Sequence, residues 1–92
     1  MEETAKQQRM EFLYQLLSHI QTPEDMEALL ADLCTRKEVE NMAERVFAAR
    51  LLLENNTYAQ VMEQCSISSA TLSRVSRCVQ YGTGYRRAIT GE

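Results

Sequence analysis

Apolar residues recur at three- and four-residue spacing along most of the chain, which is typical of amphipathic helices. The predicted helices cover residues 4–20, 23–34, 36–54, 58–65, 69–80 and 85–90. No segment alternates with period two for long enough to predict a strand. The pattern therefore indicates an all-α fold of about six helices.

Three threonines mark predicted helix starts. Thr22, Thr35 and Thr57 each precede a helix, and a side chain three residues later could reach back to each cap. Pro23 falls at a first helical position, where its missing N–H leaves no hydrogen bond unmade. Asn55-Asn56 is expected to end the third helix.

The length and the apolar content of the chain do not match a solitary small domain. A chain of 92 residues predicts a single domain over residues 1–92. So short a chain buries a small share of its surface, yet 45% of its residues are hydrophobic. This excess indicates that a partner chain covers part of the apolar surface.

The charges are distributed unevenly along the chain. Residues 1–65 carry 6 Lys/Arg and 12 Asp/Glu, a net charge of −6, whereas residues 66–92 carry a net charge of +3. We interpret the acidic part as a scaffold and the basic end as a contact surface. The alternative is a short tail that merely ends in arginines.

The beginning of the sequence lacks the basic start and apolar run of a secretion signal, and no stretch approaches the ~18 apolar residues of a membrane span. Cys34, Cys65 and Cys78 lie far apart among apolar neighbours, which predicts buried free thiols in a reducing compartment. With no C-x-x-C motif and His19 as the one histidine, no zinc site is expected. We expect a cytoplasmic protein without a membrane partner.

Residues 57–78 predict a helix-turn-helix, in which two short helices are separated by a turn at residues 66–68. The apolar residues that would pack these helices at a steep angle are Val61, Cys65, Ile67, Leu72 and Val75. Met62 and Ser66 depart from the usual pattern of such motifs, which have a small residue and a glycine there. A serine in a left-handed turn would cost energy that glycine avoids.

The second helix of this motif has two predicted faces. Leu72, Val75 and Val79 share a buried side, and the opposite side presents Ala70, Ser73, Arg74, Arg77 and Tyr81. This face has small side chains at its N-terminal end and arginines further along. Such a face suits the DNA major groove, where arginine binds guanine or phosphate in a bidentate manner. The candidate contacts to double-stranded DNA are Thr57, Ser68, Ser69, Ala70, Thr71, Ser73, Arg74 and Arg77.

Several segments resemble one known family, the YerC/YecD group of Trp-repressor-related proteins. They are Asp32-Leu-Cys-Thr35, Ala43-Glu-Arg-Val46, Ala49-Arg-Leu-Leu52, Thr57-Tyr58, Ala70-Thr-Leu-Ser-Arg-Val75, Arg77-Cys78 and Tyr81-Gly82. The resemblance covers roughly residues 20–85 and is weaker toward the Trp repressor itself and lac-type repressors.

The resemblance implies an intertwined homodimer and a transcriptional regulator. Residues 4–54 would form the interlocked dimerisation helices, residues 57–80 the helix-turn-helix, and residues 81–92 a short C-terminal helix or tail. The two-fold axis would set the reading heads on half-sites about one helical turn apart, ~34 Å. A sequence-specific repressor is the function that this implies.

The resemblance also implies a small-molecule effector. The Trp repressor binds its amino acid with two arginines, which Arg45 and Arg74 resemble. It has glycine where this chain has Val75, whose branched side chain would crowd an indole, so an effector other than tryptophan is expected. Arg74 could instead contact phosphate, or brace the fold through a carboxylate such as Glu44.

Other functional classes have less support. His19 lies at a helix end, and the chain has no glycine-rich phosphate loop, nucleophile elbow or metal cluster, so we expect no enzyme. The main alternative is a helix-turn-helix that binds protein without reading DNA. Steep salt dependence would identify a DNA binder. RNA suits the motif less well, because A-form RNA does not open its major groove to a helix.

Overall fold

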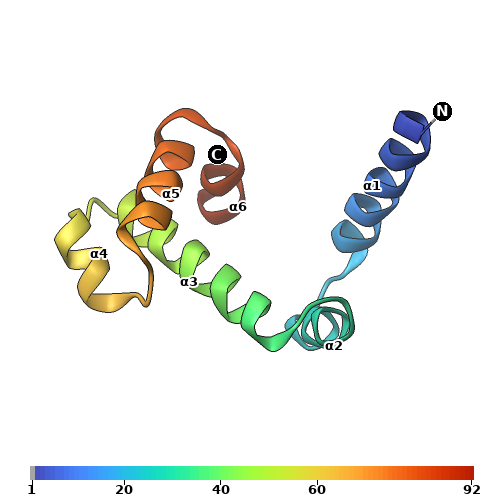
Figure 1. The fold of residues 1–92 in the computed structure, drawn as a ribbon, viewed down its shortest axis with the longest axis horizontal. Helices are drawn as coiled ribbons and strands as arrows, with labels where there is room; N and C mark the ends of the chain where they lie inside the picture. Colours follow the sequence, from blue (N-terminus) through green and yellow to red (C-terminus); the bar gives the residue numbers. More distant parts are fainter. Residues whose placement is uncertain (1) are drawn as a thin grey trace. The chain divides into compact units, whose positions relative to one another are not determined.

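The computed structural model describes residues 2–92, which form six α-helices and no strand (Figure 1). The helices are α1 (Glu2–His19), α2 (Pro23–Leu33), α3 (Arg36–Leu53), α4 (Tyr58–Gln64), α5 (Ser69–Tyr81) and α6 (Gly84–Thr90). The predicted all-α class is confirmed, and every predicted helix lies within two residues of its observed bounds.

Helix starts follow the predicted capping residues. The Thr22 hydroxyl accepts a hydrogen bond from the Asp25 N–H at 3.1 Å, and Pro23 occupies the first turn of α2. The third helix begins at Arg36, directly after Thr35. Local sequence therefore places the start of α2 and accounts for the sharp break after α1.

The chain divides into two units, residues 1–35 and residues 36–92. The described part of the first unit comprises α1 and α2, and neither helix contains a buried residue. Its exposed large apolar side chains are Met10, Phe12, Tyr14, Leu16 and Leu33. Within this unit, α1 and α2 therefore do not bury each other's large apolar side chains.

The second unit has its core around the C-terminal half of α3, where α4, α5 and α6 gather (Figure 1). Ala48 and Ala49 of α3 are completely buried, because their small side chains allow the other helices to approach closely. One cluster joins Ala48, Leu51, Val61, Cys65 and Leu72. A second joins Ala49, Val75 and Val79, against which Tyr85 and Ile89 pack. These two clusters hold α5 against α3.

The link between α3 and α4 depends on two asparagines. Asn55 adopts a left-handed conformation with φ of 69°, which asparagine tolerates better than most residues. The Asn56 side-chain amide donates to the Leu51 carbonyl oxygen at 2.9 Å. Together they end α3, as predicted, and fix where α4 begins.

Gly82 ends α5 at a point where no side chain fits. Its N–H donates to the Cys78 carbonyl oxygen at 2.9 Å, and an added Cβ would lie 2.8 Å from the same oxygen. We predict that Gly82→Ala lowers the free energy of unfolding by about 1–3 kcal/mol, because overpacking against backbone forces a shift.

Gly84→Ala is the matched control for this prediction, since an added Cβ at Gly84 meets nothing within 4 Å. Chemical denaturation of both variants would show a loss at Gly82 alone. Equal stability of the two variants would contradict the steric explanation.

Candidate nucleic-acid interface

The first helix of the predicted motif, α4, begins with a complete capping box. The Thr57 hydroxyl accepts from the Gln60 N–H at 3.2 Å, and the Thr57 N–H donates to Gln60 Oε1 at 2.7 Å. Reciprocal bonds of this kind satisfy two otherwise orphaned donors. Thr57 is exposed, and its side chain has a structural role whether or not it also contacts DNA.

The start of α5 has a second local cap. The Ser68 hydroxyl accepts from the Thr71 N–H at 3.2 Å and donates to Thr71 Oγ1 at 3.0 Å. Ser69 and Ala70 follow in the first turn, and both are exposed. The N-terminal end of α5 therefore presents small side chains on a well-defined backbone.

The turn before α5 differs from the prediction. Asn55 is the one residue other than glycine with a positive φ in the described chain, so Ser66 does not adopt the left-handed conformation that we expected. Cys65 is extended instead (φ −119°, ψ 142°), and so is Ser68 (φ −74°, ψ 157°). The residues on either side of Ser66 and Ile67 are extended, and Ser66 has no positive φ, so serine fits without the cost that glycine would avoid.

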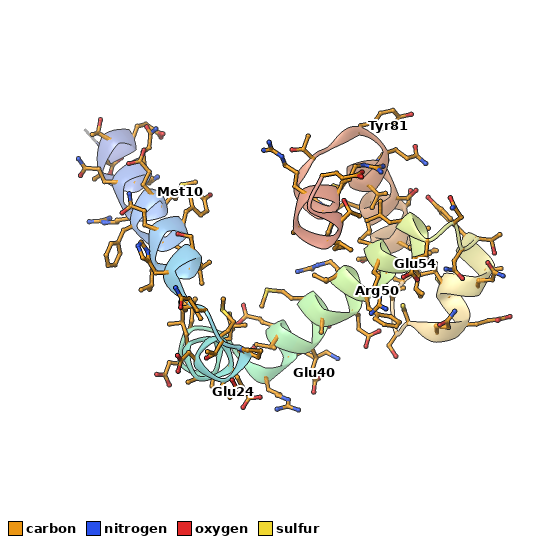
Figure 2. All side chains as sticks on the ribbon, turned by 180° about the vertical axis from the view of Figure 1, so that it is seen from behind. Met10, Glu24, Glu40, Arg50, Glu54 and Tyr81 are labelled. Carbon is orange, nitrogen blue, oxygen red and sulfur yellow. The ribbon has the colours of Figure 1, made fainter. Side chains whose placement is uncertain are left out.

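The buried face predicted for α5 is confirmed, and the predicted exposed face is confirmed except at Ser73. Leu72, Val75 and Val79 are buried, whereas Ala70, Arg74 and Arg77 are exposed and Ser73 is half-buried. Tyr81 is 83% exposed and projects away from the core at the end of the helix (Figure 2). In the described chain, neither Arg74 nor Arg77 forms an ion pair, so both guanidinium groups remain available.

A cavity of about 430 Å³ lies beside this helix. Its lining brings together the two predicted effector arginines, Arg45 from α3 and Arg74 from α5. Val75 also lines it, together with three residues that the sequence did not single out for this role: Thr71, Cys78 and Tyr85. Two guanidinium groups at one cavity suit a small carboxylic acid.

The suggested brace between Arg74 and Glu44 is not formed. Glu44 Oε1 instead accepts a hydrogen bond from the Ser66 N–H at 2.8 Å. Ion pairs join Arg36 to Glu40 within α3 and Arg50 of α3 to Glu54 just beyond its end; Figure 2 labels Glu40, Arg50 and Glu54. Of the three alternatives for Arg74, contact with phosphate and binding of a small acid remain.

A family model for the Trp repressor protein matches residues 8–90, which is most of the chain. The chain belongs to the Trp repressor family. It is 41% identical over 81 residues to YerC of Bacillus subtilis, a protein of uncharacterized function, and the match covers 84% of this chain and 78% of YerC. It also matches the crystal structure of a candidate Trp repressor from Staphylococcus aureus, with a TM-score of 0.84 and 26% identity over 90% of this chain and 84% of the other.

Not all arginines of the basic end of this Trp repressor family protein are equally available. The Arg86 guanidinium donates to the Val79 carbonyl oxygen at 3.1 Å and so ties α6 to the end of α5. Arg87 is exposed in the last turn of α6. The expected contact surface therefore narrows to Arg74, Arg77 and Arg87, while Arg86 has a structural role.

The cysteines are free, but they are not all buried as predicted. Cys65 is buried, Cys34 is half-buried and Cys78 is exposed. The prediction that Cys78 is buried rested on its apolar neighbours in sequence and is wrong. Cys78 lies one turn beyond Arg74, at the cavity, and not among the core valines. Burial and then the nearby Glu44 carboxylate raise the pKa of the Cys65 thiol.

We predict that Cys78 reacts with a thiol reagent much faster than Cys65 in the native protein. Cys78 is exposed, whereas Cys65 is covered and its raised pKa lowers the fraction of reactive thiolate. Mass spectrometry after timed alkylation at pH 7.5, with unfolded protein as the control, would measure both rates. Comparable native rates would contradict the burial of Cys65.

Proposed function

We propose that this Trp repressor family member is a sequence-specific DNA-binding regulator of transcription, and that α5 reads the major groove. The observation that supports this is the outer face of α5. Its first turn has small side chains, and Arg74 and Arg77 further along are exposed and form no ion pair in the described chain. Arginine is the side chain best suited to bidentate contact with guanine or phosphate. No acidic residue lies between Ser66 and Glu92 to repel the DNA backbone.

In this proposal α4 and α5 form the helix-turn-helix of residues 57–80. The capped ends at Thr57 and Ser68 would set the two helices against the duplex, with Ser69, Ala70 and Ser73 close to base edges. A protein bound over a promoter would block RNA polymerase, so we propose repression as the mode of regulation. We place this activity in the cytoplasm. None of the described helices has the length and hydropathy that a membrane crossing requires.

The deciding experiment has two steps. Fragments of the source genome that the purified protein retains would first be selected and sequenced. The affinity for a selected duplex would then be measured by fluorescence anisotropy between 50 and 200 mM salt, with an unrelated duplex of equal length as the control. We expect a loss of about 100-fold or more over this range, because binding releases counterions from several phosphates.

A different outcome would favour the alternative function. Failure to enrich any fragment, with no salt-dependent binding to duplex DNA, would overturn the proposal. A protein-interaction module should instead retain its partner with little dependence on salt, because an apolar interface releases few ions.

We further propose that residues 4–54 form the dimerisation region. The large apolar side chains of α1 and α2 are not buried within their own unit, and Phe12 is 68% exposed. Such surface is normally covered in a stable protein, and a second copy of the same helices is the occupant that the family implies. Sedimentation equilibrium at micromolar concentration should give twice the chain mass, and a folded monomer would contradict this part of the proposal.

An effector is the last part of the proposal. Arg45 would bind the carboxylate of a small acid in the cavity, and Arg74 would join it there in place of a phosphate contact, since the two roles are alternatives. The Val75 side chain would exclude an indole. Calorimetric titration with tryptophan and with shorter carboxylic acids would test this directly. Tight binding of tryptophan would show that Val75 leaves room for it.

A further inference from the structure

We infer that Glu44 is a positioning residue for α5: its carboxylate holds the turn between α4 and α5, and with it the N-terminal end of the reading helix, on the α3 scaffold. This inference rests on the proposed function, since it assigns a part in DNA recognition to a residue that does not itself face the duplex. The residue lies outside the motif of residues 57–80 and carries the wrong charge for a DNA contact.

The contact that carries the inference joins residues far apart in sequence. The Ser66 N–H donates to Glu44 Oε1 at 2.8 Å, across 22 residues of chain. Ser66 lies outside both α4 and α5 and has no helical hydrogen-bond partner for its N–H. The acceptor is a carboxylate on a long, regular helix, and a bond to an ionised acceptor is stronger than one between neutral groups.

The other hydrogen bonds described for this turn are local. The Cys65 N–H donates to the Val61 carbonyl oxygen, Ser68 bonds to Thr71, and the Leu72 N–H donates to the Ser68 carbonyl oxygen. These bonds shape the ends of α4 and α5 but do not attach the turn to another element. Attachment to α3 by hydrogen bonding therefore comes from Glu44.

Packing anchors the turn on one side. Ile67 packs against both core clusters and fixes the inner side of the turn. On the other side the turn borders a hollow of about 240 Å³, lined by Asn41, Glu44, Arg45, Ser66, Ile67, Ser68 and Thr71. Because few side chains fill this side, the position of the turn depends there on the Glu44 hydrogen bond.

The bond itself lies at the surface, where Ser66 is exposed and Glu44 is half-buried. The same carboxylate contributes to the raised pKa of the buried Cys65 thiol, which places its charge close to the start of the turn. Loss of the bond would free Ser66 and let the Ser68–Thr71 end of α5 shift against the duplex.

The test compares Glu44→Ala with Glu44→Gln. The glutamine variant keeps an oxygen that can accept from the Ser66 N–H, and both variants remove the same negative charge. We expect Glu44→Ala to lose about tenfold in the ratio of affinities for selected and unrelated duplexes, which matches the loss of one hydrogen bond to a charged group. Glu44→Gln should keep this ratio within about threefold, since the bond persists in neutral form.

Two readouts separate positioning from contact and from general destabilisation. The slope of log affinity against log salt should be unchanged in both variants, because Glu44 neutralises no phosphate. Amide hydrogen exchange should show faster exchange at Ser66 in Glu44→Ala, with protection of the core amides in α5 retained. Arg74→Ala provides the contrast, as the magnitude of its salt slope should fall by about one for each protomer of the dimer.

An unchanged specificity ratio in Glu44→Ala, or an equal loss in both variants, would overturn the inference. Wild-type exchange at Ser66 as fast as in Glu44→Ala would also overturn it, because the bond would then protect nothing. If the wild-type protein binds no duplex at all, the proposed function fails, whereas the exchange experiment still decides whether Glu44 holds the turn.

Discussion

Replacing Arg74 and Arg77 together by alanine is expected to weaken binding to the selected duplex by about 100-fold or more. Each arginine that contacts a base or phosphate contributes about 1–3 kcal/mol, and a dimer would lose both copies. The expectation rests on the exposed positions of the two side chains and on the absence of ion pairs at either one in the described chain. Fluorescence anisotropy on the selected and unrelated duplexes would measure the loss.

The single variants Arg74→Ala and Arg77→Ala should show whether each arginine contacts phosphate or a base. A residue that binds only phosphate should lower affinity equally on both duplexes, whereas a base contact should lower the ratio between them. Arg77→Lys and Arg74→Lys sharpen the distinction, because lysine keeps the charge but cannot form the planar bidentate contact.

Arg36→Ala is the matched control for charge. Arg36 is an exposed arginine whose ion pair with Glu40 is on the surface, where such a pair contributes little to stability. The Arg36→Ala variant removes one positive charge, as each α5 variant does, but from α3. If Arg36→Ala weakens binding as much as the variants on α5 do, net charge rather than the α5 face determines affinity, and the proposed reading helix is wrong.

The features that could be predicted from sequence are those with a local cause. The helix bounds follow from three- and four-residue spacing, and the starts of α2 and α4 follow from Thr22 and Thr57 with their partners three residues on. The buried side of α5 was predicted for the same reason, because Leu72, Val75 and Val79 repeat along one helix face.

The features that could not be predicted depend on contacts between helices distant in sequence. Glu44 gives no signal within its own helix, and its partner Ser66 is 22 residues away. Tyr85 reaches the cavity only because α6 folds back beside α5, and the exposure of Cys78 depends on where that cavity opens. Periodicity describes one helix at a time and does not contain this information.

Leu72→Ala is expected to lower the free energy of unfolding by about 2–5 kcal/mol, the usual cost of removing a fully buried leucine side chain. Leu72 is completely buried and joins three helices, since Ala48 and Leu51 of α3 and Val61 of α4 share its cluster. For a domain of this size the melting temperature should fall by roughly 10 °C or more. Thermal and urea denaturation would measure both quantities.

The Leu72 variant and the Arg77 variant together separate stability from recognition. Arg77→Ala should stay within about 0.5 kcal/mol of the parent, because its side chain is exposed and unpaired, yet it should weaken DNA binding. Leu72→Met, which nearly conserves volume, should cost less than about 1.5 kcal/mol and remain folded. Below its transition, this methionine variant should bind the selected duplex as the parent does, because Leu72 faces α3 and α4. A stability loss below about 1 kcal/mol in Leu72→Ala would show that the leucine does not anchor α5 as its complete burial indicates. Weakened binding by a folded Leu72→Met protein would show that Leu72 also affects recognition.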